Sequence, residues 1–349
     1  MPSSVELGID YSTSNILIYE KNKGIVFDEP SAIAYNRETK QIIAIGKEAF
    51  QMIGRTPENI SAIRPLHSGE ASEFEMAAEL LRLAVLKVIK KRGVFSRPRA
   101  LLALPISMQE RDKENLVHTL YDAGMKKTQL IHKGVAACLG MGIKIDKYRR
   151  LIVDISGGTT DIMIISNRIT SGKFIEVSSK SLDKSVSGDT FSNAIVNYFE
   201  NSHSFQISMD TADDIKEQYA SLYASPNSPS IDVWGRGKLT GMIQKKHVAE
   251  TDIASEMIQP ATIIVNFIQA VINVLNPQEA LDVQNNGIYL TGGGAMLKGL
   301  DRFIQSNLQL KTHISYNSRM DTALGLGYAL ENPQEVQDYL SYARTGLFR

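Results

Sequence analysis

Apolar residues in the first 50 positions come in short runs, which is typical of strands rather than helices. The segments "VELGIDY" and "NILIYEK", over residues 5–21, predict two strands joined by a small polar turn. The segments "SAIAYN" and "IIAIG" predict two further strands, with "NRETK" as the turn between them. The chain therefore opens as β-structure.

Helical spacing of apolar residues first appears over residues 71–93, where Phe74, Leu80 and Val85 fall on one face and Gly93 ends the predicted helix. A strand "RALLALPIS" and a helix "MQERDKENLVHTLYDAG" follow. The same order then starts again. "RLIVDISGGTTDIMIISN" predicts two strands, and later helices are expected at 188–201, 211–223 and 250–275, with Pro260 as a kink or break in the last. Residues 286–307 predict a strand, a Gly-rich turn and a helix.

Two of the predicted strand–turn–strand segments are alike. "LGIDYSTSNILIY" and "LIVDISGGTTDIMII" align with Asp10 on Asp154, and each runs from an apolar strand through an Asp and a small-residue turn into another strand. The distance between them is far too long for a solenoid repeat. The pattern predicts a duplicated α/β domain with two hairpins facing each other.

Composition restricts the function classes. The chain has 349 residues with 38 Lys+Arg and 38 Asp+Glu, and this zero net charge argues against a general nucleic-acid binder. The single cysteine, Cys138, excludes an internal disulfide and is expected to be a small core residue, while Trp234 is expected to pack in the interior. With no signal-peptide pattern and no apolar run near eighteen residues, we expect a cytoplasmic protein without a transmembrane helix.

Three turns carry the candidate chemistry. Backbone N–H groups and hydroxyls in "DYSTSN" and "DISGGTTD" can form nests for phosphate oxygens. The leading Asp10 and Asp154 would repel phosphate directly, and their natural role is to hold a hydrated Mg²⁺. The third turn, "TGGGAMLKG" over residues 291–299, offers a helix N-terminus to a nucleotide.

This order of turns resembles the actin, sugar-kinase and DnaK superfamily, with connecting helices at 132–142 and 322–332 whose glycines and alanines permit close packing. Within it, the chain resembles the bacterial actin MreB family over nearly its whole length, most specifically in "GKEAFQMIGRTPENISAIRPL", "SGDTFSNAIVNYF" and "IYLTGGGAMLKGLD". The resemblance implies an α/β actin-like fold: two duplicated RNase H-like domains with an ATP cleft between them, each with a small inserted subdomain.

The resemblance also implies four subdomains and a set of ligand-binding residues. The subdomains are IA (1–32, 66–145 and 316–349), IB (33–65), IIA (146–181 and 247–315) and IIB (182–246). ATP or ADP with Mg²⁺ is expected, with Asp10 and Asp154 at the metal. The nucleotide-binding positions that it implies are Ser12, Thr13, Ser14, Asn15, Gly157, Gly158 and Thr159 at the phosphates, Gly188 and Asp189 near the ribose, Asp213, Lys216 and Glu217 at the adenosine, and Gly292, Gly293, Gly294 and Met296 at the base and phosphate.

The chain departs from the family at the catalytic position. The first connecting helix of the family starts with Glu-Glu-Pro, whose second Glu orients the attacking water, but here the residues are His132, Lys133 and Gly134. A charged lysine has no acceptor, so we expect Lys133 to pair with the γ-phosphate and hydrolysis to be weak. The remaining candidates in this degenerate catalytic set are Asp154, Thr160 and Asp161, of which Thr160 and Asp161 can hold a water.

Two further departures replace glycines of the family's hairpins by Ser12 and Ser156. A β-carbon there would crowd the phosphate if the backbone needs a positive φ, whereas the hydroxyl could instead add a hydrogen bond. The sequence leaves both outcomes open.

The resemblance implies polar filaments of paired protofilaments, sister MreB-like proteins as partners, and a role in cell shape or cell movement. Three alternatives remain: a fully active ATPase filament with a substitute catalytic residue, a nucleotide-independent scaffold for sister filaments, and a metabolite kinase. The loop "KKRGVFSRPR" leaves two interpretations open as well. Val94 and Phe95 either dip into anionic lipid at the inner face of the membrane, or Phe95 packs on the core.

Overall fold

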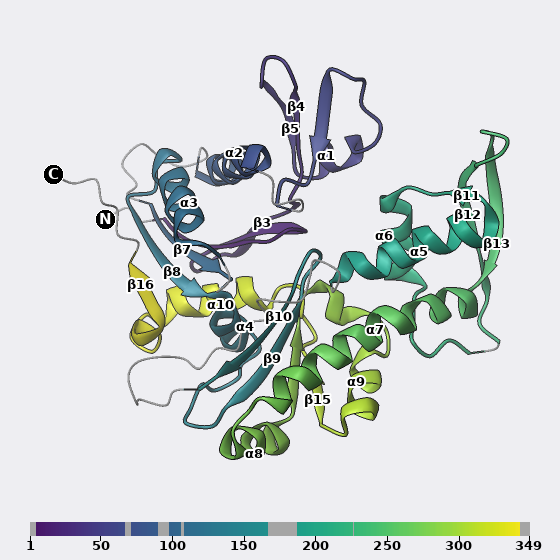
Figure 1. Ribbon diagram of the computed structural model, residues 1–349. Helices are drawn as coiled ribbons and strands as arrows, with labels where there is room; N and C mark the ends of the chain where they lie inside the picture. The colour runs from purple at the N-terminus through teal and green to yellow at the C-terminus, as the bar shows by residue number, and fades with distance from the viewer. Residues whose placement is uncertain are drawn as a thin grey trace. The chain divides into compact units, whose positions relative to one another are not determined.

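The computed structural model describes residues 5–66, 71–89, 98–105, 108–166, 187–225 and 227–342. These form two compact units (Figure 1): unit 1 holds the described residues up to 147 and from 320 onward, and unit 2 holds those from 148 to 319. Each unit contains one larger and one smaller sheet. The finer division into four subdomains stays a prediction.

The larger sheet of unit 1 has the strand order β16-β8-β7-β1-β2-β3. β1 runs antiparallel to β2 and parallel to β7, and it is buried along almost its whole length because helices cover both faces of the sheet. Its strands are β1 (Glu6–Tyr11), β2 (Asn15–Glu20), β3 (Gly24–Pro30), β7 (Arg99–Leu104), β8 (Lys127–His132) and β16 (Leu340–Tyr342). The opening strands predicted from the apolar runs are confirmed.

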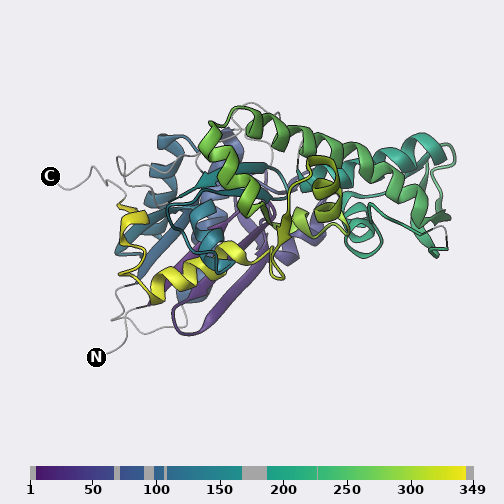
Figure 2. The same ribbon diagram turned by 90° about the horizontal axis from the view of Figure 1, so that it is seen from below.

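Helices α2 (Ala71–Ile89) and α3 (Glu110–Asp122) share the main core of unit 1 with β1 and β7, and their cluster includes Leu80, Leu102 and Leu116. Helices α4 (Lys133–Gly140) and α10 (Asp321–Glu331) lie side by side, as Figures 1 and 2 show.

The packing of α4 against α10 brings their backbones into contact. A β-carbon at Gly140 would collide with the carbonyl of Asp321, and one at Gly325 with the carbonyl of Ala136. The prediction that small residues permit close packing of these helices is confirmed. Cys138, on the same helix, is fully buried, as expected for a small core residue.

The smaller sheet of unit 1 has the order β5-β4-β6 and is inserted between β3 and α2. Its elements are β4 (Ile33–Asn36), β5 (Ile42–Ile45), α1 (Lys47–Met52) and β6 (Ile60–Ile63). The predicted turn between the first two strands is closed by Asn36, whose side-chain oxygen accepts hydrogen bonds from the backbone N–H groups of Glu38 and Thr39.

The larger sheet of unit 2 repeats the opening of unit 1 and has the order β10-β9-β14-β15. β9 runs antiparallel to β10 and parallel to β14, just as β1 does with β2 and β7. The predicted internal repeat is therefore present in the strand pairing. The elements are β9 (Arg150–Ile155), β10 (Thr160–Ile165), α7 (Glu250–Asn273), α8 (Pro277–Asn286), β14 (Ile288–Thr291), the 3₁₀ turn η1 (Gly293–Met296), α9 (Leu300–Leu308) and β15 (Thr312–Ile314).

Helix α7 runs through Pro260 without a break (Figure 1), so the alternative of a broken helix is wrong. Among the described residues, α7 is the one helix long and apolar enough to cross a membrane. Its Ile253, Met257, Ile264 and Ile268 belong to the core of unit 2, which accounts for its apolar composition.

The smaller sheet of unit 2 has the order β11-β12-β13. Its elements are α5 (Gly188–His203), β11 (Phe205–Gln206), α6 (Met209–Gln218), β12 (Ser230–Gly237) and β13 (Ile243–Ala249). The expectation that Trp234 packs in the interior is wrong, because Trp234 lies on the outer face of β12 and its side chain is 63% exposed.

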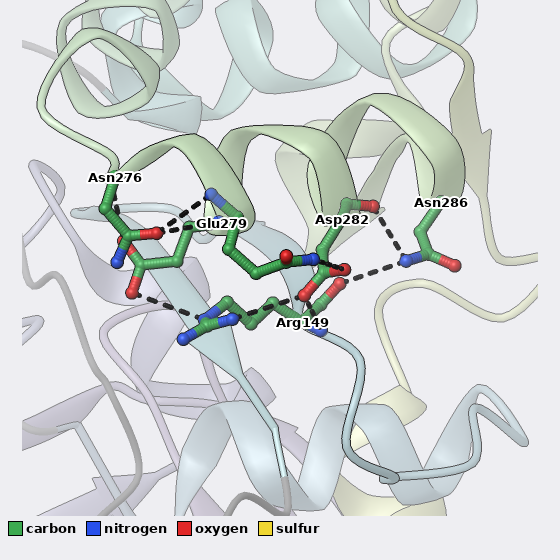
Figure 3. Close-up of polar contacts among 6 residues, drawn as sticks. Arg149, Asn276, Glu279, Asp282 and Asn286 are labelled. Atoms are coloured by element: carbon green, nitrogen blue, oxygen red, sulfur yellow. Dashed lines mark hydrogen bonds and ion pairs between the residues drawn. The ribbon is translucent and has the colours of Figure 1, made fainter.

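A buried cluster of charged and polar side chains joins α8 to the start of β9 (Figure 3). The guanidinium of Arg149, which is 4% exposed, lies 3.3 Å from Glu279 Oε1 and 3.3 Å from Asp282 Oδ2. The side chain of Asn276 caps α8 by accepting hydrogen bonds from Gln278 and Glu279, and the amide of Asn286 donates to the Arg149 carbonyl at 3.3 Å. One arginine thus fixes a helix against the strand that leads to the second hairpin.

Candidate functional site

The first candidate turn is the tip of the β1–β2 hairpin, residues 12–14. The backbone N–H and the hydroxyl of Ser12 each donate to the carbonyl of Asn15 at 3.0 Å, and the Asn15 N–H donates to Ser12 Oγ at 3.3 Å. Ser12 does not have a positive φ. The replacement of a family glycine by Ser12 is therefore free of backbone strain, and the added hydroxyl closes the turn.

Both connections to the smaller sheet of unit 1 touch this tip. At the entry to β4, the buried Ser31 donates its N–H to the Ser14 carbonyl at 2.8 Å and its hydroxyl to the Ser12 carbonyl at 2.6 Å. At the exit from β6, Arg64 Nη2 donates to Ser14 Oγ at 3.3 Å. Thr13 lies between these fixed points and is half-buried. The tip is therefore held from behind at two carbonyls and one hydroxyl.

We expect Ser31→Ala to weaken nucleotide binding by about fivefold, because loss of one buried hydrogen bond costs about 1 kcal/mol and here loosens the tip. The backbone bond to Ser14 remains, so the fold is retained. Titration with a fluorescent ATP analogue measures the effect, and Ser61→Ala, at another buried serine of unit 1, serves as the control. Equal affinity of Ser31→Ala and the wild type would contradict this role.

The second candidate turn is the tip of the β9–β10 hairpin in unit 2. The Ser156 N–H donates to the Thr159 carbonyl at 2.8 Å, and its hydroxyl donates to Asp154 Oδ1 at 3.0 Å. Ser156 also lacks a positive φ. At both serines the hydroxyl therefore adds a hydrogen bond and the backbone is not strained. This is the second of the two outcomes that the sequence left open.

The N-terminus of α5 is attached to this second tip. The N–H of Gly188 donates to the Ser156 carbonyl at 2.8 Å, and that of Asp189 donates to the Gly157 carbonyl at 2.7 Å. Ser187 caps the helix through a capping box with Thr190. These two N–H groups of the helix therefore hold the tip in place. On the tip itself, Gly157 and Gly158 are partly exposed and Thr159 is fully exposed.

Behind the tip, Thr160 is buried and Asp161 is half-buried at the start of β10. Asp161 lies opposite Asp154 in the strand register, and Thr159 Oγ1 donates to Asp161 Oδ2 at 3.5 Å.

The Gly-rich turn after β14 packs on the end of β9. Gly292 has φ +83°, and a β-carbon there would collide with the carboxylate of Asp154 and the carbonyl of Ile155. Gly294 is equally tight against Ile155, whereas Gly293 is open and Met296 is 56% exposed. Two of the three glycines are therefore required by packing, and Gly293 and Met296 are the members of this turn that are accessible to a ligand.

Helix α6 places Lys216 and Asp213 against α5. Lys216 Nζ donates to Asp213 Oδ1 and to Ser192 Oγ, both at 2.7 Å, and lies 3.5 Å from the Gly188 carbonyl. Both ionic side chains are largely covered, while the neighbouring Glu217 is exposed. Lys216 and Asp213 thus connect α6 to the first turn of α5.

The position that the sequence analysis expects to be a degenerate catalytic one lies at the start of α4 in unit 1. Lys133 is the first residue of the helix and is half-buried, and Gly134 behind it is fully covered. Burial lowers the pKa of the neighbouring His132, and the positive charge of Lys113 lowers it further. Both effects favour the neutral form of His132.

The two candidate metal residues are each the next-to-last residue of the first strand of their hairpin. Asp10 is 4% exposed and Asp154 is 1% exposed. Among the described residues no three His, Cys, Asp or Glu side chains gather as a metal cage. Each carboxylate by itself has the chemistry of a Mg²⁺ ligand, because Mg²⁺ commonly takes one or two carboxylates and completes its shell with water and phosphate oxygens.

Comparison with known proteins decides the family. A family model described as "MreB/Mbl protein" matches residues 4–338. The chain belongs to the MreB/Mbl family. It is 33% identical over 328 residues to the cell shape-determining protein Mbl of Bacillus cereus, covering 94% of this chain and 96% of that protein.

Solved structures show the fold of this MreB/Mbl protein. The crystal structure of MreB 5 of Spiroplasma citri bound to AMPPNP matches with a TM-score of 0.85 at 28% identity, covering 97% of this chain and 99% of that one. The MamK double helical filament, 19% identical, matches with a TM-score of 0.74 over 94% and 99% of the two chains. The predicted actin-like α/β fold and the predicted MreB family are confirmed.

Sequence reasoning missed the anchors of the first tip in this family member. Ser31 begins the predicted strand "SAIAYN", and Arg64 lies within the stretch "SAIRPL". No spacing rule connects either residue to the hairpin. The signal available was a polar serine next to an apolar run. Val94 and Phe95, the candidate lipid contact, lie outside the described residues.

Proposed function

We propose that this chain binds ATP with Mg²⁺, assembles into filaments and hydrolyses ATP weakly. The observation that carries the proposal is the repeated hairpin: in each unit a buried Asp is the next-to-last residue of a strand and a closed turn of small residues follows. The bound AMPPNP of the related S. citri MreB 5 supports the choice of nucleotide.

Each hairpin supplies half of the phosphate contacts in this proposal. In unit 1 Ser12 and Asn15 close the turn, and Thr13 and Ser14 at its tip are assigned to the phosphate oxygens. In unit 2 Gly157, Gly158 and Thr159 are assigned in the same way, with Gly293 and Met296 toward the base. Gly188 and Asp189 in the first turn of α5 are assigned to the ribose, and Asp213, Lys216 and Glu217 in the second half of α6 are assigned to the adenosine. Both tips are held by hydrogen bonds from behind, so little ordering is required when phosphate binds.

Asp10 and Asp154 are assigned to the hydration shell of Mg²⁺. When bound, the metal neutralises charge on the β- and γ-phosphates. Ser156, which donates to Asp154 Oδ1, orients that carboxylate.

Weak hydrolysis follows from Lys133. An ammonium has three donors and no acceptor, so it cannot take a proton from an attacking water while it is charged. A phosphate nearby stabilises the charged form and raises the pKa of a lysine further. Lys133 thus favours bound ATP, while Thr160 and Asp161 are left to position the water.

Filament formation is proposed from the family. The related MamK forms a double helical filament, and the related Mbl determines cell shape. For this chain we propose polar filaments of paired strands, in the cytoplasm at the membrane, that contribute to cell shape or movement together with sister MreB-like proteins.

Nucleotide binding and assembly are tested together with the purified full chain. We expect a fluorescent ATP analogue to bind in Mg²⁺ and to lose most of its affinity in excess EDTA, and ATP with Mg²⁺ to give a pelletable polymer. Binding that is unchanged by EDTA would overturn the metal assignment. Polymer formed equally without any nucleotide would instead favour a nucleotide-independent scaffold.

A further inference from the structure

The segment that follows α6 runs beside the segment that follows the Gly-rich turn. Ser221 and Lys298, 77 positions apart, form a parallel β-bridge. The N–H of Leu222 donates to the Lys298 carbonyl at 2.9 Å, and the Ser221 hydroxyl donates to the same carbonyl at 3.4 Å. We call this contact, between residues 218–223 and 297–299, the Lys298 bridge. It connects a helix of the smaller-sheet region to a turn of the larger-sheet region within unit 2.

The side chain of Lys298 adds a second connection, at the end of α6. Its Nζ donates to the carbonyl of Gln218, the last residue of that helix, at 2.7 Å. The last carbonyls of a helix have no partner within it, and a cation placed there also interacts favourably with the helix dipole. Lys298 therefore holds the end of α6 by its side chain and the following segment by its carbonyl.

The bridge lies on buried apolar side chains. Leu222 and Leu297 are 7% and 8% exposed, and both belong to the core of unit 2. Gly299 has φ +85°, and a β-carbon there would collide with the ring of Tyr223. Glycine at this position therefore lets the ring lie directly on the backbone of the turn. The two segments are thus held together by packing as well as by hydrogen bonds.

The residues next to the bridge are the ones that the proposed function assigns to the nucleoside. Glu217 directly precedes Gln218, and Met296 lies two residues before Lys298. Both side chains are exposed. Because their neighbours in the chain are joined, the bridge fixes the spacing between the end of α6 and the accessible part of the Gly-rich turn.

We propose that Lys298 is a positioning residue for the base of the nucleotide. It holds Glu217 and Met296 at the spacing that the base requires, and it acts through them without contacting the nucleotide itself. With this spacing set in advance, binding does not have to order the two segments. The inference rests on the proposed function and adds to it a residue outside the set of expected ligand contacts.

The structure separates this role from a general role in stability. Removing the side chain of Lys298 leaves the backbone bond to Leu222 and both buried leucines in place. Only the connection to Gln218, at an exposed helix end, is lost. The fold should therefore be retained, and the effect should be confined to the base end of the nucleotide.

The experiment measures how firmly the base is held. It uses the full chain with Mg²⁺, at a concentration that gives no pelletable polymer, and the triphosphate of 2-aminopurine riboside, whose base is the fluorophore. We expect Lys298→Met, which keeps an unbranched stem and removes the donor, to weaken binding of this probe and of ATP about fivefold, the effect of one hydrogen bond. The fluorescence anisotropy of the bound base at saturation should also fall.

Two further variants complete the test. Lys298→Arg keeps a charged donor and should restore both the affinity and the anisotropy. Lys311→Met, at another exposed lysine of unit 2 that lies outside the bridge, is the matched control and should behave as the wild type does. The urea midpoint of unfolding should be the same for the wild type and all variants.

Three results would overturn the inference and leave the proposed function in place. One is unchanged affinity and anisotropy in Lys298→Met. Another is a loss of affinity with unchanged anisotropy, which would place the effect at the phosphates. The third is a loss of affinity together with a lower urea midpoint, which would assign Lys298 to stability. A wild type that binds neither ATP nor the probe would instead refute the proposed function, and the inference with it.

Discussion

Replacing Lys133 by glutamate is expected to accelerate phosphate release from ATP at least tenfold. The substitution introduces an acceptor at the first turn of α4, where the proposed function expects the side chain that orients the attacking water. Positioned general bases contribute about 10²–10⁴-fold to rates, and a restored group in a site adapted to lysine should recover the lower part of that range. The loss of the ammonium should at the same time weaken ATP binding.

The measurement is phosphate release at saturating ATP, with nucleotide occupancy determined for both proteins. Lys126→Glu, at an exposed lysine of unit 1, controls for the change in net charge. If the wild type already releases phosphate rapidly and Lys133→Glu is no faster, another residue positions the attacking water. The interpretation of this chain as a slow ATPase would then be wrong.

Replacing Arg149 by alanine is expected to lower the free energy of unfolding by about 3–5 kcal/mol. The change leaves Glu279 and Asp282 buried and charged with no cation between them, and breaking a buried ion pair on one side costs about this much. The loss should appear in unit 2, because α8 then loses its side-chain ion pairs with the residue that precedes β9, while the backbone bonds of residue 149 to Asp282 and Asn286 remain.

Urea denaturation followed by circular dichroism measures this loss. A triple variant, Arg149→Met with Glu279→Gln and Asp282→Asn, removes all three charges and should recover most of the stability, since desolvation of the ions no longer opposes folding. A change below about 1 kcal/mol in Arg149→Ala, the range of an exposed pair, would show that water reaches the cluster and that the pair is not needed.

The fold could be predicted from the sequence wherever apolar runs were long and turns were polar. The strands around Asp10 and Asp154 and their repetition are of this kind, because a strand covered on both faces must be apolar throughout. The β12–β13 hairpin was missed although Ile231 and Val233 alternate with polar positions. Its exposed Trp234 breaks the rule that aromatic residues are buried, and only tertiary structure shows which face of a ribbon is covered.

The site was less predictable than the fold. Asp10, Asp154 and the small turns could be found because they repeat. The effect of Ser12 and Ser156 could not be derived, since it depends on φ angles that the sequence does not reveal. The role of Ser31 was missed for a related reason. Its two hydrogen bonds join segments that are separated along the chain, and no local sequence pattern predicts them.

The joint between α4 and α10 has a consequence for how such proteins diversify. At Gly140 and Gly325 the two backbones are in contact and leave no room for a side chain, so these two positions are closed to substitution. The first residue of α4 lies outside that joint and is half-exposed. An exchange of glutamate for lysine at this one position would therefore leave the packing of α4 on α10 unchanged, and under the proposed function it would lengthen the time for which ATP stays bound.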